Sequence, residues 1–180
     1  EREYIFADLP DIGYSTDIDT VMASSYQVKK QLQQIVKIEQ PITNTLLYKR
    51  ILRIWNLTRV TTRLQVFIDN LLEDAYKDPL SGDTIIYWED EEKAKDCDFY
   101  RINSKRDILD IPILEVMSAA RYAIEQQISM PTEDLKRLTS QLLGFSRKGN
   151  NLDMVTEQTI QLLVDQGIFS HANGMVSMNN

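Results

Sequence analysis

The fold is decided by residues 42–59, which read Ile-Thr-Asn-Thr-Leu-Leu-Tyr-Lys-Arg-Ile-Leu-Arg-Ile-Trp-Asn-Leu-Thr-Arg. The same pattern returns 88 residues later at 130–147, which read Met-Pro-Thr-Glu-Asp-Leu-Lys-Arg-Leu-Thr-Ser-Gln-Leu-Leu-Gly-Phe-Ser-Arg. Many apolar positions fall on apolar positions with no gap in the alignment, such as Leu47 on Leu135, and the offset holds outward as far as Ala75 and Leu163. Because a fixed offset of this kind indicates an internal repeat, the chain is predicted to contain two copies of one unit.

Each copy is predicted to contain three helices. Apolar residues recur three and four positions apart, as in Leu32, Ile35 and Val36, which is the period of an amphipathic helix. Polar breaks that contain proline, at 40–41 and 129–131, end the first helix of each copy. The first helices are expected at about 21–39 and 112–127, the second begin near Thr43 to Asn44 and at Thr132, and the third run to about Asp74 and Asp165.

A β-hairpin is predicted after the third helix of the second copy. Asn173 and Gly174 lie between two short alternating runs, 168–171 and 175–178. Asn-Gly between such runs is the strongest local signal for a hairpin, because both residues tolerate the positive φ angles of the turn.

The first copy carries weaker β signals. A turn-rich segment, 78–83, precedes a predicted strand at 84–88, and a second strand is expected at 99–102. Three helices followed by a β-hairpin is the winged-helix arrangement. The predicted fold class is therefore mainly α (α+β), with two tandem winged-helix-like units.

The composition is that of an acidic globular chain. Its 180 residues include 27 acidic and 20 basic side chains, with a net charge of −7 and 43% hydrophobic residues. This argues against a protein that coats nucleic acid over its whole surface and against wholesale disorder. The single cysteine forms no intrachain disulfide, and no apolar run reaches the roughly 18 residues of a membrane span. We expect a cytoplasmic protein without a membrane partner and, since it starts at Glu1, a piece of a longer polypeptide.

Positive charge is concentrated in one segment. Residues 27–63 carry eight bases and one acid, whereas residues 1–26 and 64–99 have net charges of −5 and −8. A smaller stretch without acids, residues 135–152, adds four bases. An acidic protein can present a local basic face in this way.

Helical geometry separates the basic side chains from the apolar ones. At about 100° per residue, Lys49, Arg50 and Arg53 lie on a different arc of the second helix from Ile51 and Trp55. In a helix-turn-helix, the start of the third helix enters the major groove while the preceding helix crosses the backbone. The residues predicted to bind nucleic acid are Lys49, Arg50, Arg53, Arg59, Thr62 and Arg63 in the first copy, and Arg147, Lys148 and Asn150 in the second.

A solvated helix face is the alternative interpretation of these cations. Lys and Arg on helices commonly serve solubility, and the acidic segment that follows could neutralise them. The second copy carries less charge, since Leu138 stands opposite Arg50 and Asn151 opposite Arg63. The acidic run 89–92 beside the first hairpin would repel phosphate.

Catalytic chemistry is not predicted. His171 is the one histidine and lies beside a predicted turn, where an exposed polar residue is a simpler explanation than a general base. Cys97 lies between Asp96 and Asp98, whose negative charges disfavour the thiolate. The sequence has no glycine-rich phosphate loop and no metal-ligand spacing. We expect no enzyme activity, no cofactor, no metal and no small-molecule substrate.

Several stretches of the chain resemble a known family. They are residues 35–42 (Ile-Val-Lys-Ile-Glu-Gln-Pro-Ile), 50–55, 59–64 and 142–149 (Leu-Leu-Gly-Phe-Ser-Arg-Lys-Gly). They look like the C-terminal domain of unknown function of large bacterial superfamily-1 helicase-like proteins that also carry a Vsr-like endonuclease domain. The resemblance covers about residues 20–180 and departs from the family pattern at Asn56, Thr61 and Asn151. It implies DNA transactions in which other domains of the parent hydrolyse ATP and cut DNA.

Together these features predict a non-catalytic accessory module of a helicase or nuclease. The expected parts are an N-terminal extension (1–19) and two winged-helix units (20–102 and 103–180). Its expected partners are duplex DNA, bound through the basic face of the first unit, and the other domains of the parent. The alternative is a structural or protein-interaction module that docks within the parent.

Overall fold

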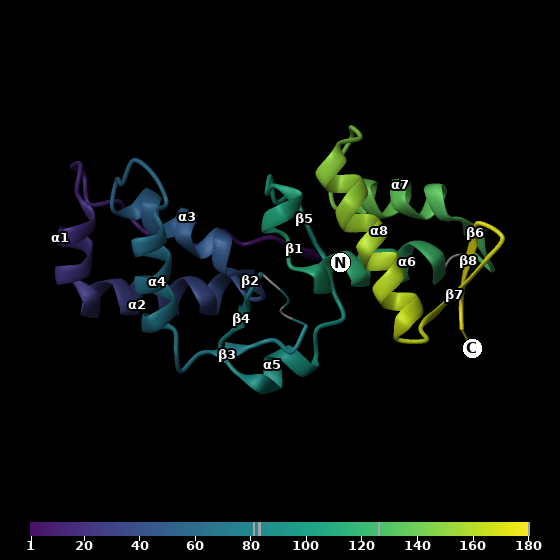
Figure 1. Ribbon diagram of the computed structural model, residues 1–180, viewed down its shortest axis with the longest axis horizontal. Helices are drawn as coiled ribbons and strands as arrows, with labels where there is room; N and C mark the ends of the chain where they lie inside the picture. Colours follow the sequence, from purple (N-terminus) through teal and green to yellow (C-terminus); the bar gives the residue numbers. More distant parts are fainter. Residues whose placement is uncertain (81, 83, 126, 180) are drawn as a thin grey trace. The chain divides into compact units, whose positions relative to one another are not determined.

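The chain folds into two compact units, which are described separately (Figure 1). The computed structural model describes residues 1–80, 82, 84–125 and 127–179. We call residues 5–96 the N-terminal unit, and residues 1–4 with 97–180 the C-terminal unit. Both consist mainly of helices with small sheets, which confirms the predicted mainly α (α+β) class.

The N-terminal unit packs its helices beside a three-stranded antiparallel sheet. The strand order is β2-β4-β3, with Ile42 opposite Tyr87 and Tyr76 opposite Trp88. Its elements are α1 (Ile18–Ala23), α2 (Ser25–Glu39), β2 (Ile42–Thr43), α3 (Asn44–Ile54), α4 (Thr62–Leu71), β3 (Tyr76–Lys77), β4 (Ile86–Trp88) and α5 (Glu91–Lys95).

Helices α3 and α4 form where capping residues and apolar spacing agree. The hydroxyl of Thr43 accepts a hydrogen bond from the backbone N–H of Leu46, and the hydroxyl of Thr61 accepts one from Leu64. These bonds satisfy N–H groups that would otherwise lack a partner at a helix start. Leu47 and Leu64 are completely buried, so both apolar faces enter one core. The predicted start of the second helix is confirmed.

The C-terminal unit repeats the same order of elements. Its sheet has the order β6-β8-β7, and the predicted hairpin is confirmed as β7 paired with β8 around Asn173 and Gly174, both at positive φ. Its elements are β1 (Arg2–Glu3), β5 (Arg101–Ile102), the 3-10 helix η1 (Ile108–Asp110), α6 (Ile113–Glu125), β6 (Met130–Pro131), α7 (Thr132–Leu142), α8 (Asn150–Asp165), β7 (Phe169–Ala172) and β8 (Met175–Met178).

The offset of 88 residues is kept by the structure. Helices α6, α7 and α8 each begin 88 residues after α2, α3 and α4, and β6 begins 88 residues after β2. Since the two copies were aligned on sequence alone, this coincidence of starting residues supports the interpretation that the chain is a duplication.

Two predictions for the first copy are wrong. The expected single helix over 21–39 is two helices that meet at Ser24, where a φ of −98° and a ψ of 30° depart from helical geometry. The expected hairpin partner at 99–102 supplies β5, which pairs in parallel with β1 in the C-terminal unit, whereas β4 pairs with β2 and β3. Tyr100 packs into the core of the C-terminal unit, and this contact decides where the segment belongs. Of the predicted turn at 78–83, Ser81 and Asp83 lie outside the described residues.

The N-terminal segment does not form one separate extension. Residues 1–4 belong to the C-terminal unit, where the guanidinium carbon of Arg2 lies 3.9 Å from the ring centre of Phe99. Residues 5–19 belong to the N-terminal unit, where Ala7 is buried and donates its N–H to Glu39. The boundary between the units also lies at 96/97 rather than at the expected 102/103.

A buried ion cluster holds the start of the C-terminal unit. Both carboxylate oxygens of Glu115 accept hydrogen bonds of 2.8 Å from Arg106, and Arg101 binds the same carboxylate. Burial opposes ionisation of Glu115, but the two guanidinium groups outweigh it and lower its pKa. The ring of Tyr4 lies 4.4 Å from the Arg106 guanidinium carbon, which ties the N-terminal residues to this cluster.

None of the helices in the described ranges combines the length and the apolar character needed to span a membrane.

Candidate nucleic-acid interface

The predicted basic face of α3 is largely occupied by groups of its own unit. Arg50 donates two hydrogen bonds of 2.8 Å to Glu39, whose side chain is completely buried. A buried carboxylate needs a partner of opposite charge. Arg50 supplies that charge to Glu39, so its guanidinium is not available to bind phosphate. Lys49 is exposed on the same helix. The prediction that Arg50 contacts nucleic acid does not fit this geometry.

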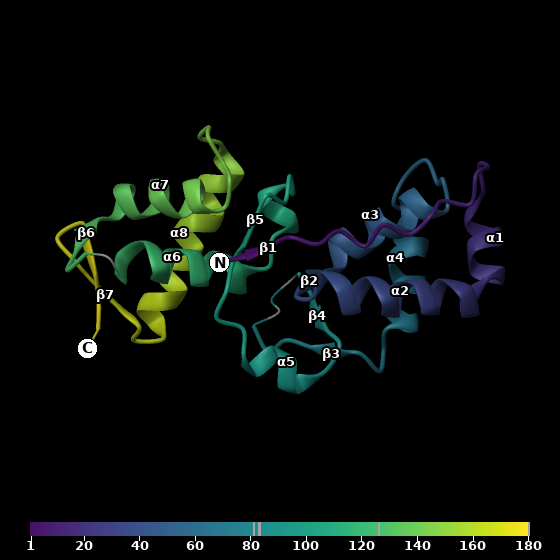
Figure 2. The same cartoon turned by 180° about the vertical axis from the view of Figure 1, so that it is seen from behind.

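Residues 5–13, which we call the strap, run along α3 (Figure 2). Arg53 donates a hydrogen bond of 2.8 Å to the carbonyl of Leu9 and lies 3.5 Å from a carboxylate oxygen of Asp8. The ring of Phe6 lies 5.0 Å from the Arg53 guanidinium carbon. The strap therefore competes with any anion for Arg53.

The turn before α4 and its first residues hold the other predicted contacts of this unit. Arg63 pairs with Asp19 at 2.7 Å, whereas Arg59 and Thr62 are exposed. Within the described ranges Arg59 makes no hydrogen bond or ion pair. Of the predicted arginines of the N-terminal unit, Arg59 is thus the one without a bound acid in the described structure.

The predicted residues of the C-terminal unit are exposed, and within the described residues the two cations among them lack the ion pairs seen in the N-terminal unit. Arg147, Lys148 and Asn150 are exposed at the turn between α7 and α8 and at the start of α8. In the part of the chain that the structure describes, neither Arg147 nor Lys148 has an ion-pair partner. Gly149 replaces the capping Thr61 of the first unit, so no side chain caps the first turn of α8. These three residues lie together because they are near neighbours in the sequence, and their contact with nucleic acid stays a prediction.

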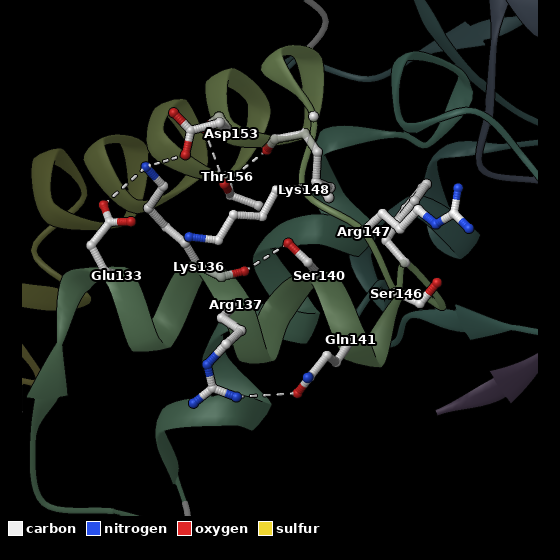
Figure 3. Close-up of a pocket in the computed structure, with 13 residues that line it drawn as sticks. Glu133, Lys136, Arg137, Ser140, Gln141, Ser146, Arg147, Lys148, Asp153 and Thr156 are labelled. Atoms are coloured by element: carbon white, nitrogen blue, oxygen red, sulfur yellow. Dashed lines mark hydrogen bonds and ion pairs between the residues drawn. The ribbon is translucent and has the colours of Figure 1, made fainter.

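A cavity of about 210 Å³ lies between α7, the turn and α8 (Figure 3). Phe145 and Leu152 supply apolar surface, while Arg137, Arg147 and Lys148 bring cations to it. Arg137 already binds Asp134 at 3.1 Å. The two cations from the turn are therefore the ones that remain for a ligand.

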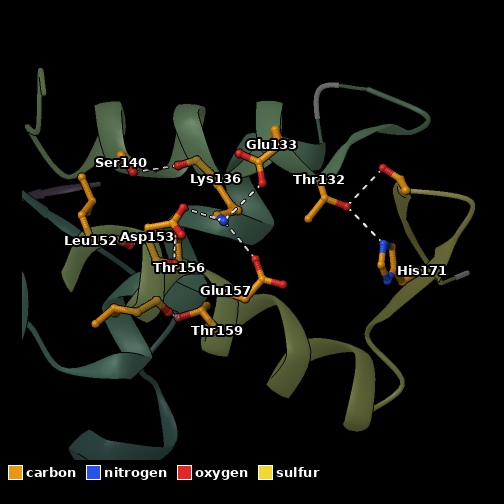
Figure 4. A network of polar contacts seen from close by, with 12 residues as sticks. Thr132, Glu133, Lys136, Ser140, Leu152, Asp153, Thr156, Glu157, Thr159 and His171 are labelled. Carbon is orange, nitrogen blue, oxygen red and sulfur yellow. Dashed lines mark hydrogen bonds and ion pairs between the residues drawn. The ribbon is translucent and has the colours of Figure 1, made fainter. Parts of the chain in front are cut away.

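Lys136 is a feature that sequence reasoning misread. The sequence places it among the four bases of the acid-free stretch 135–152. In the structure it is buried, and its ammonium contacts Glu133 at 3.2 Å, Asp153 at 2.6 Å and Glu157 at 3.0 Å (Figure 4). Burial works against its charge, but the carboxylates prevail and raise its pKa. Asp153 and Glu157 are one turn apart on α8, and this spacing is the signal that could have revealed a shared partner.

His171 and Cys97 are the residues that the sequence offered for catalytic chemistry. His171 is exposed and its Nε2 lies 3.1 Å from the hydroxyl of Thr132 (Figure 4). Cys97 is partly buried. No group of three or more His, Cys, Asp or Glu side chains suited to a metal ion occurs among the described residues.

Comparison with known proteins gives one match. A protein-family model described as "Protein of unknown function (DUF3320)" matches residues 22–66, which span α2, β2, α3 and the start of α4. This match supports a domain of unknown function in the N-terminal unit. Neither the search of curated proteins nor the search of solved structures found a match.

Proposed function

We propose that this chain is a non-catalytic accessory module of a bacterial helicase or nuclease that binds duplex DNA through tandem winged-helix-like units in the cytoplasm. The observation that carries the proposal is the equivalence of Arg59 and Arg147. These two arginines are 88 residues apart and both are exposed. Arg59 lies in the turn before α4, and Arg147 lies in the turn before α8.

The order of elements supports the winged-helix interpretation. Each unit runs helix, strand, helix, helix, strand, strand, and in each the first strand pairs with the last. In helix-turn-helix proteins the start of the third helix meets the major groove, and cations at its entry contact phosphates. Thr62 and Asn150 begin α4 and α8 and supply small polar groups beside Arg59 and Arg147.

The resemblance to the C-terminal domain of helicase-like proteins with a Vsr-like endonuclease supports the place of the module within a larger enzyme. In that setting other domains of the parent would hydrolyse ATP and cut DNA, and this chain would hold the duplex near them. Its role would be binding and positioning rather than chemistry.

Fluorescence anisotropy of the full chain on duplex, single-stranded and RNA probes across a salt series tests the proposal. We expect salt-dependent binding that favours the duplex, weakened by Arg59→Glu combined with Arg147→Glu. Lys77→Glu combined with Lys105→Glu is the matched control, because these exposed lysines give the same change in net charge away from the turns. Absence of salt-dependent binding, or equal affinities of the two double variants, would contradict the proposal.

A docking module is the second candidate, and a groove in the N-terminal unit favours it. A hollow of about 430 Å³ between α2 and the end of α4 is lined by apolar Leu71, Leu72 and Trp88, with Lys29 and Lys37 among its polar residues. If the module serves docking alone, cross-linking in the intact parent should place another domain at this groove, and the chain should show no affinity for duplex DNA.

A further inference from the structure

The cavity between α7 and α8 differs from the basic face of α3 in how its charges are balanced. Lys136 engages Asp153 and Glu133, the two carboxylates that line the cavity, and also Glu157. Because Lys136 is buried and remains charged, these acids have a partner inside the unit. The turn contributes no acid of its own, since residues 135–152 contain none.

Two cations at the cavity have no such partner. Arg147 and Lys148 both line it, and the described structure gives them no ion pair. In Figure 3, dashed lines reach Lys136 and Arg137 but none reaches the guanidinium of Arg147. Ser146 is exposed and also lines the cavity, so its hydroxyl is a further polar group there. Unpaired cations beside a hydroxyl are the donors that a phosphate group requires.

We infer that Ser146, Arg147 and Lys148 form a binding site for one phosphate group at the cavity between α7 and α8. The inference rests on the proposed function, since it takes the group to be a backbone phosphate of the duplex. It goes further in assigning the tighter phosphate contact to the C-terminal unit, although the N-terminal unit contains the more basic segment.

The equivalent position in the N-terminal unit does not offer this site. Val60 stands where the second unit has Lys148, and Tyr48 stands where it has Lys136. Only Arg59 matches a cation of the site. A single exposed arginine offers a phosphate group fewer donors than an arginine followed directly by a lysine.

The first experiment asks whether the site takes phosphate at all. Inorganic phosphate is titrated into the full chain at constant ionic strength, with chloride as the reference anion, and backbone amide shifts are followed by NMR. We expect saturable shifts at residues 145–149 in the wild type and in a control carrying Lys77→Gln and Lys105→Gln. Arg147→Gln combined with Lys148→Gln should abolish saturation. Equal saturation in both double variants would overturn the inference.

Ser146→Glu provides an independent variant. Position 146 is exposed, and a carboxylate placed there would compete with phosphate for Arg147 and Lys148. We expect Ser146→Glu to block the phosphate shifts, whereas the uncharged Ser146→Gln should retain them. If Ser146→Glu binds phosphate as well as Ser146→Gln does, the inference fails.

The second experiment uses a 12-bp duplex and separates this inference from the proposed function. We expect Arg147→Gln combined with Lys148→Gln to bind the duplex about tenfold more weakly than the lysine control, with a log–log salt slope lower by about 2. Duplex binding by the wild type together with equal affinities of the two double variants would overturn the phosphate site and leave the proposed function standing. Saturable phosphate binding without duplex binding would support the site, identify its ligand as a free phosphate compound and contradict the proposed function.

Discussion

The two units have the same order of elements but use their cations differently. In the N-terminal unit Arg50 and Arg63 pair with acids of their own unit, and the strap covers Arg53. In the C-terminal unit Arg147 and Lys148 are unpaired within the described residues. A shared arrangement of helices thus fixes where cations stand. The acids brought to them by other segments decide whether those cations are available.

A second contrast lies in the polar contact between α3 and α4 and the equivalent contact between α7 and α8. Tyr48 donates to Asp69 at 2.7 Å in the N-terminal unit, while 88 residues later Lys136 binds Glu157 at 3.0 Å. In one unit an aromatic hydroxyl links the two helices at this position, and in the other an ammonium group does. The order of the helices is the same in both units, whereas the polar groups that link them differ.

The largest expected effect is a loss of stability in the C-terminal unit that leaves the N-terminal unit unchanged. Glu115→Gln leaves Arg101 and Arg106 buried without their carboxylate, and we expect a loss of about 3–5 kcal/mol in the C-terminal unit. Both tryptophans, Trp55 and Trp88, lie in the N-terminal unit. Tryptophan fluorescence should therefore report an unchanged N-terminal unit while far-UV circular dichroism shows early unfolding.

A triple replacement controls this experiment. Arg101→Met, Arg106→Met and Glu115→Leu remove all three charges together and should recover much of the lost stability. Equal destabilisation by the single and triple variants would show that packing, not charge, holds this region.

Acid should weaken the C-terminal unit through the same carboxylate. The folded pKa of Glu115 is lowered below its ordinary value of 4.5, so its contribution is complete above that value and is lost as pH falls through the folded pKa. Circular dichroism of the wild type between pH 7 and 2 should show this loss, and the triple variant should lack it. A triple variant with an unchanged acid transition would contradict the assignment.

Removing the polar groups at positions 48 and 136 should lower stability less than Glu115→Gln does. The two losses should also be unequal. Tyr48→Phe removes a partly buried hydrogen bond to a carboxylate, which costs about 1–2 kcal/mol and should appear in tryptophan fluorescence during urea unfolding. Lys136→Met should cost less than about 1 kcal/mol, because its carboxylates are well exposed and water can replace the ammonium. Equal costs would remove this contrast between the units.

The smallest expected change concerns affinity. Asp8→Asn combined with Asp19→Asn removes the exposed ion pairs of Arg53 and Arg63, which are worth at most about 1 kcal/mol each. Duplex affinity, measured by anisotropy, should rise about two- to fivefold. Glu73→Gln combined with Glu92→Gln alters net charge equally at exposed sites and should raise affinity less. If both double variants gain equally, general charge and not release of these arginines explains the change.

Local sequence patterns predicted the elements with strong periodicity. The hairpin at Asn173 and Gly174 and the start of α3 follow from turn and capping chemistry, which acts over a few residues. Strands β2, β3 and β6 were missed because each contains two residues, too few to show alternation. The pairing of β5 with β1 joins residues about 100 positions apart, and no local pattern indicates it.

The surroundings of the predicted interface residues could also be foreseen only in part. Helical geometry placed Lys49 on the surface, where it is, and Arg59 and Arg147 are exposed in the turns before α4 and α8. It could not show that Arg50 would bind Glu39, because that pair depends on the packing of α2 against α3.

The sequence by itself determined the repeat, the helices and the positions of the cations along them, since these depend on spacing within a few turns of chain. Only the tertiary structure decided which cations are bound. Ion pairing depends on distances of a few ångströms between segments far apart in sequence, such as Asp19 with Arg63 and Lys136 with Glu157. For that reason the net charge of a segment does not tell which of its cations are available to a ligand.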